Sequence, residues 1–131
     1  MALGVDRVAM DLKKLNRLPD GLKSSQRSIE IQQEIAAADT QNVQFSSEIG
    51  LYYVHLGSIQ SKLKNHSAAK ENVQKGLKIL QQYADASPQW IDLKRDLALS
   101  YQLAGEVFSD AGNGREPDKH DLDVERFAQN R

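Results

Sequence analysis

The histidines and acidic residues are the side chains in this sequence best suited to chemistry, as metal ligands or as acids and bases. The three histidines, His55, His66 and His120, do not have the spacing of metal ligands. The segment 118–125 surrounds His120 with carboxylates and is the best metal candidate, but it lacks the glycine and the ligand periodicity of a calcium loop. We therefore interpret it as a solvated, charged face.

Other patterns in the sequence also point away from catalysis. The run Gly112-Asn113-Gly114 has the character of a helix stop rather than of a phosphate-binding loop, and the serines lack the context of a nucleophile elbow. A modest basic edge, which we assign to solubility, is formed by Lys13, Lys14, Lys62 and Lys64. The sequence therefore predicts a protein that is not an enzyme, with no catalytic residue, cofactor or metal site.

Composition describes an ordinary globular chain. Its 131 residues suit a single domain, and 40% hydrophobic and 27% charged residues are typical values. A net charge of −1 argues against a nucleic-acid-binding protein, and no stretch is apolar enough for membrane insertion. The first residues lack the apolar core of a secretory signal, and there is no cysteine. We therefore expect a cytoplasmic protein without disulfides.

The sequence contains an internal repeat. Residues 26–65 align without gaps on residues 74–113 at an offset of 48, and 11 of the 40 aligned pairs are identical. A fixed period of this size is typical of repeat architectures. Gly57 and Gly105 are one such pair, and Ala9 occupies the same position 48 residues before Gly57.

Apolar residues recur at spacings of three and four, which predicts an all-α protein. Each unit pairs an A helix with a following B helix, and the short connections predict antiparallel neighbours. A short helix after Asp118 is a further expectation. The A helices are predicted at 3–15, 42–63 and 90–111, and the B helices at 19–37 and 67–85.

The glycine at position 57 requires a reason, because glycine inside a helix costs roughly 0.5–1 kcal/mol relative to alanine. A small residue at the same depth in successive A helices lets the paired helix approach closely. We expect Ala69 to be the partner of Gly57. Replacing Gly57 by leucine is then predicted to destabilise the fold by about 1–3 kcal/mol through overpacking.

The repeat unit resembles the tetratricopeptide repeat, in which an aromatic residue, a Leu-Gly pair and a later alanine form the packing signature. Ordinary units of that family have about 34 residues, so the period of 48 is similar to an extended-helix subgroup. The segment 17–24 also resembles the A-to-B junction of that subgroup. The signature is carried here by Tyr53, Leu56 and Gly57, followed by Lys64, Asn65 and Ala69.

This resemblance implies antiparallel helical hairpins stacked as a short solenoid. Two positions depart from the pattern: Ala104 precedes Gly105, and Pro117 falls where Ala69 stands in the preceding unit. We expect one domain over residues 1–131, divided into a partial first unit at 3–37, a second unit at 42–85, the start of a third at 90–111, and residues 112–131. That last segment is either a capping helix or a disordered tail. The shortened first A helix indicates either that the chain is a piece of a longer protein or that its first repeat is a degenerate terminal one.

The resemblance also implies that A-helix residues line a concave wall that binds a protein or peptide. The predicted partner-binding residues lie off the A-helix packing stripe: Val54, Ser58, Ser61, Lys62, Gln102, Glu106, Ser109 and Asp110. The sequence therefore predicts a non-catalytic interaction module. The alternative is a structural segment of a larger bacterial signalling protein, in which the repeats accompany a kinase-like or other effector domain. We also expect weak self-association, with Leu103 and Phe108 near the contact.

Overall fold

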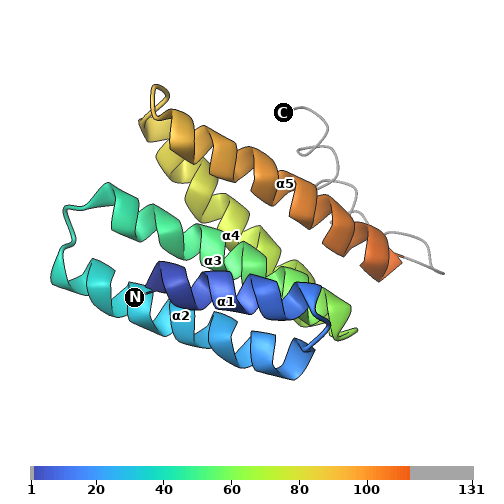
Figure 1. Cartoon of the computed structure of the whole chain (residues 1–131). Helices are drawn as coiled ribbons and strands as arrows, with labels where there is room; N and C mark the ends of the chain where they lie inside the picture. Colours follow the sequence, from blue (N-terminus) through green and yellow to red (C-terminus); the bar gives the residue numbers. More distant parts are fainter. Residues whose placement is uncertain (1, 113–131) are drawn as a thin grey trace.

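The computed structural model describes residues 2–112, and five α-helices account for nearly all of this part of the chain (Figure 1). Every predicted helix is confirmed to within one residue at each end. The short helix expected after Asp118 and most of the segment 112–131 lie outside the described residues. The helices are α1 (Ala2–Lys14), α2 (Leu18–Ala38), α3 (Val43–Lys62), α4 (His66–Ala86) and α5 (Ile91–Gly112).

Local sequence explains where these helices begin and end. A proline occupies the first turn of α2, where its missing N–H costs no hydrogen bond. Asn42 caps α3, and its side chain accepts a hydrogen bond from the Phe45 N–H at 3.2 Å. Asn16 and Lys64, which are equivalent in the repeat, both adopt positive φ values of 60° and 67° just after α1 and α3. The chain therefore reverses after each of these helices in the same left-handed conformation.

The helices pack in a regular alternation. Each helix packs against the next one in the sequence, and α3 also contacts both α1 and α5 (Figure 1). The odd-numbered helices therefore lie side by side in chain order, while α2 and α4 each pack against the odd-numbered helices before and after them. None of the helices in the described part is long and apolar enough to cross a membrane.

Two apolar clusters fill the interior. The larger cluster joins α3, α4 and α5, and includes Val54, Val73, Leu80 and Phe108. The smaller cluster joins the first three helices around Tyr52. Phe108 is only 1% exposed, so the prediction that it lies near a self-association contact is wrong. It packs into the core with α4, whereas the equivalent residue of the preceding unit is a glutamine.

The closest approach in the fold is between α3 and α4, and glycine permits it. A Cβ atom on Gly57 would lie 2.6 Å from Val73 Cγ1 and 2.7 Å from the Ala69 carbonyl oxygen. Further along the same pair of helices, a Cβ on Gly76 would overlap the carbonyl oxygen of Gly50. The predicted contact between Gly57 and Ala69 is thus confirmed, because only a glycine fits this separation.

A close helix approach at small residues also occurs between α1 and α2, but within residues 2–112 none occurs at Gly105 of α5. A Cβ on Gly21 of α2 would lie 3.2 Å from the Ala9 carbonyl oxygen of α1. In this hairpin the glycine is therefore on the second helix and the alanine on the first, the reverse of Gly57 and Ala69. A Cβ on Gly105, by contrast, would meet no described atom within 4 Å. The expectation of a close helix contact at Gly105 therefore finds no partner among the described residues.

These environments predict opposite effects for the same substitution. Gly57→Ala should destabilise the protein by about 1–3 kcal/mol, because the added methyl group overlaps α4. Gly105→Ala should stabilise it by roughly 0.5–1 kcal/mol, because it removes the conformational cost of a helical glycine without a clash. Urea unfolding of both variants measures the difference. Equal effects of the same sign would contradict the close contact.

Candidate functional site

The structure divides the eight predicted partner-binding residues into a buried and an exposed group. Val54 is completely buried against Gly76 of α4, so the prediction that it lies on a binding surface is wrong. It belongs to the face of α3 that also carries Gly50 and Gly57. Ser58 and Ser61 are buried as well. The exposed group comprises Lys62, Gln102, Glu106, Ser109 and Asp110.

The C-terminal ends of the three odd-numbered helices meet in a polar junction that includes five of these residues. The Lys13 ammonium of α1 donates a hydrogen bond to the Ser58 hydroxyl of α3. The Ser61 hydroxyl of α3 donates to Asp110 Oδ2 of α5 at 3.3 Å. We refer to Lys13, Ser58, Ser61, Lys62, Glu106 and Asp110 as the polar junction.

Charges at the polar junction are close enough to influence one another. Burial lowers the pKa of Lys13 below its usual value, and Lys62 acts in the same direction. The carboxylates of Glu106 and Asp110 oppose this shift. The junction therefore contains both signs of charge, and its exposed members can form ion pairs and hydrogen bonds with a partner's side chains.

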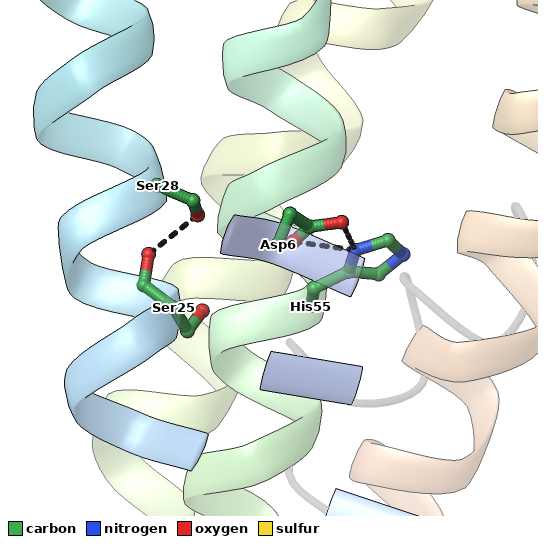
Figure 2. A network of polar contacts seen from close by, with 4 residues as sticks. All are labelled: Asp6, Ser25, Ser28 and His55. Atoms are coloured by element: carbon green, nitrogen blue, oxygen red, sulfur yellow. Dashed lines mark hydrogen bonds and ion pairs between the residues drawn. The ribbon is translucent and has the colours of Figure 1, made fainter. Parts of the chain in front are cut away.

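A second polar contact, between Asp6 of α1 and His55 of α3, is almost closed to solvent. His55 Nδ1 lies 2.9 and 2.8 Å from the two carboxylate oxygens, and Asp6 is 4% exposed (Figure 2). A carboxylate only accepts hydrogen bonds, so Nδ1 carries the proton and donates it. The pair fixes the position of α1 on α3. Sequence reasoning missed Asp6, although it occupies the position of the core residue Val54 one period earlier.

Polar side chains of α2 and α3 continue this contact. The Ser28 hydroxyl donates to the Ser25 carbonyl oxygen at 2.7 Å, and Figure 2 shows both serines on the helix beside Asp6 and His55. The Ser25 and Tyr52 hydroxyls are buried and have no hydrogen-bond partner among residues 2–112. Burial raises the pKa of Tyr52 well above its usual value, with Glu48 and Asp6 adding to the effect, so the phenol stays protonated.

Two half-buried carboxyl groups lie near the same contact. Burial raises the pKa of Glu48, although hydrogen bonds from Gln44 at 3.2 Å and Gln32 at 3.0 Å favour its charged form. Burial also raises the pKa of Asp96 on α5, and nearby Asp92 reinforces this shift while His55 opposes it. Acidic groups of α1 and α5, Asp6 and Asp96, thus lie close enough to His55 of α3 to interact with it.

Metal binding receives no support from these groups. No cluster of three or more histidine, aspartate or glutamate side chains within residues 2–112 is arranged to hold a metal ion. The segment 118–125, the best metal candidate in the sequence, lies outside the described residues. His66 lies at the start of α4 with its Nδ1 buried and without a hydrogen-bond partner.

A surface pocket of about 400 Å³ lies between the C-terminal half of α4 and the N-terminal half of α5. Leu97 and Ala98 contribute apolar surface, and the polar lining includes Gln81, Asp85 and Tyr101. These polar groups bond to one another: Gln81 donates to Asp85 at 2.7 Å and accepts from Tyr101 at 3.0 Å. These three polar groups of the pocket are therefore already engaged within the protein, and the lining also includes Lys94.

Comparison of the chain with protein-family models, curated proteins and solved structures found no match. The functional argument therefore depends on the chain's own residues, its internal repeat and the contacts described above.

The repeat itself supplies the replacement that tests the Asp6–His55 pair. The residues 48 positions later are Val54 and Leu103, so Asp6→Val with His55→Leu installs the apolar pair of the next unit. Each single change should destabilise the protein by about 1–3 kcal/mol, because it leaves a buried polar partner unsatisfied. The double variant should return to within about 1 kcal/mol of the wild type or exceed it.

Urea unfolding of the two single variants and the double variant measures the coupling, with the exposed Asp20→Ala as the surface control. Additive effects of the two single changes would show that the residues do not interact.

The raised pKa of Asp96 predicts a pH-dependent effect of Asp96→Asn. Because the folded state favours the protonated form, wild-type stability falls as pH rises from the usual aspartate value through the raised pKa. The substitution should therefore raise Tm near about pH 7 and have little effect near about pH 3. Thermal unfolding at both values measures this, with the exposed Asp11→Asn as control. A Tm gain that is equal at both pH values would contradict the assignment.

Proposed function

We propose that this chain is a non-catalytic, tetratricopeptide-like helical repeat that binds a protein or peptide across its odd-numbered helices. In this proposal α1, α3 and α5 are the A helices of a short solenoid, and α2 and α4 are the B helices. Two features support the arrangement: the side-by-side order of the odd-numbered helices, and the recurrence of small residues where α1 meets α2 and where α3 meets α4.

The observation that carries the binding role is the exposed part of the polar junction. Lys62 of α3 and Glu106 and Asp110 of α5 are exposed beside one another, and the hydrogen bond from Ser61 to Asp110 joins the two helices. Gln102 and Ser109 extend the exposed surface along α5. Since folding leaves these charges in solvent, they are available to a partner.

The mixture of charges favours a particular kind of partner. Lys62 can form an ion pair with an acidic side chain of the partner, while Glu106 and Asp110 can form ion pairs with basic ones. Electrostatic complementarity of this kind contributes more to specificity and association rate than to affinity. We therefore propose a peptide or helix that carries both signs of charge, spaced to meet α3 and α5 together.

Site-specific photocrosslinking in the source cells tests the binding role. A photoreactive residue placed at Gln102 should capture a partner, whereas one at the exposed Lys78 on α4 should not. Adding Lys62→Glu and Glu106→Lys to the Gln102 protein should reduce the yield of the crosslinked product several-fold, since the charge pattern is reversed. Equal capture from both positions, or a yield that the charge reversal does not change, would contradict the proposal.

A second role, as a stacking segment of a larger assembly, is favoured by the two end helices. Leu99 of α5 is 53% exposed, and Gly105 of the same helix has open space around it among the described residues. On α1, Val8 is 49% exposed, whereas its equivalent Leu56 is 6% exposed because α2 precedes it. A photoreactive residue at Leu99 distinguishes the roles: capture of another repeat segment there, with none from Gln102, would favour stacking.

A further inference from the structure

The two hairpins are built on one plan, but their interiors differ in chemistry. In the hairpin of α3 and α4, the buried positions are apolar or small. In the hairpin of α1 and α2, four of the equivalent positions are polar and equally buried, whereas others, such as Ile29 and Ala36, are apolar in both hairpins. The equivalent pairs, 48 residues apart, are Asp6 and Val54, Ser25 and Val73, Ser28 and Gly76, and Gln32 and Leu80.

This difference makes α1 the weakly attached helix of the fold. Its fully buried apolar residues are the small Ala2 and Ala9. Its larger apolar side chains are only half-buried or are exposed: Val5, Met10 and Leu12 are half-buried, and Leu3 and Val8 are exposed. The Ser25 and Tyr52 hydroxyls remain without hydrogen bonds in the surrounding interior, which opposes burial. A helix with few buried apolar contacts opens at a lower free energy than the rest of the molecule.

The contacts that do hold α1 are specific rather than strongly apolar. Ala2, Asp6, Ala9 and Lys13 are spaced by four, three and four residues, and therefore lie along one face of the helix. The two alanines allow close approach, as where Ala9 faces Gly21 of α2. The two charged residues pair with groups of α3: Asp6 with His55, and Lys13 with Ser58.

The site beneath α1 complements this face. His55 provides a hydrogen-bond donor for a carboxylate. Three residues further along, Ser58 provides an acceptor for an ammonium group, and Glu106 and Asp110 add negative charge near it. The positions of the two charges therefore distinguish one direction and one register of a bound helix from the others.

We propose that α1 is an exchangeable helix, which opens from α2 and α3 as a unit in the native protein, and that the vacated site accepts a partner's helix with the same face. That face has the pattern Ala-x3-Asp-x2-Ala-x3-Lys, with the carboxylate bound by His55 and the lysine by Ser58. The proposal concerns the site beneath α1, which shares Glu106 and Asp110 with the exposed surface of the proposed function, but its tests below do not rely on capture of a partner at that surface.

Native-state hydrogen exchange of the full chain tests the opening. Amides of α1 should exchange about tenfold or more faster than those of α3 and α4, with a weaker dependence on denaturant than the global unfolding reaction. In the Asp6→Val and His55→Leu double variant, exchange of the α1 amides should slow toward that of α3 and α4. Exchange of α1 together with α3 and α4 in the wild type would overturn the proposal.

Fluorescence anisotropy with a labelled peptide of residues 2–16 tests the exchange. The peptide should bind the full-length protein, and Asp6→Asn in the peptide should weaken binding by about tenfold. The double variant should not bind it, while the exchange rates of α3 and α4 show that this variant is folded. Opening of α1 without peptide binding would overturn the proposal. A dimer formed without peptide and lost in the double variant would overturn the assignment to a partner's helix and identify a second copy as the occupant.

Discussion

The close approach of α3 and α4 is the contact on which the rest of this structure depends. Three glycines, Gly50, Gly57 and Gly76, bring the two backbones together, and any larger side chain at these positions would overlap the opposite helix. This separation places Val54 and Val73 in the same interior, from which the larger apolar cluster extends to α5. Because α3 also contacts α1 and α2, its position determines where every other helix lies.

The sequence predicted the helices well because their signals are local. The three-and-four spacing of apolar residues locates each helix without knowledge of the helices that pack against it. The repeat added one contact between helices, that of Gly57 with Ala69, because a glycine retained inside a helix indicates close packing. Gly105 occupies the equivalent position on α5, but no helix among the described residues packs against it. The repeat therefore preserves the glycine without preserving its packing partner.

The candidate site was predicted only in part, because α3 has more than one buried face. Four successive apolar residues, Leu51, Tyr52, Tyr53 and Val54, point to all sides of this helix, a pattern that indicates burial on more than one face. Treating α3 as an ordinary two-sided helix left Val54, Ser58 and Ser61 on the surface. The Asp6–His55 pair joins residues 49 positions apart, and such a pairing is visible in the sequence only as a charged residue at a core position of the repeat.

The polar interior of the first hairpin and the apolar interior of the second give one fold two kinds of helix contact. Apolar packing around Val54 and Leu80 favours a permanent core, whereas the paired charges of α1 favour specificity at the expense of strength. The exposed charges of the polar junction continue this chemistry onto the surface of α3 and α5. This combination of contacts is the basis on which we propose that the chain recognises a partner's helix.

NMR contacts of the Gly57 α-protons report on the separation of α3 and α4. We predict nuclear Overhauser effects from these protons to the Val73 methyl groups and to Ala69 on the opposite helix, because no side chain separates the two backbones there. Effects from Gly57 confined to its own helix would contradict the close approach of α3 and α4, and with it the packing order of the whole fold.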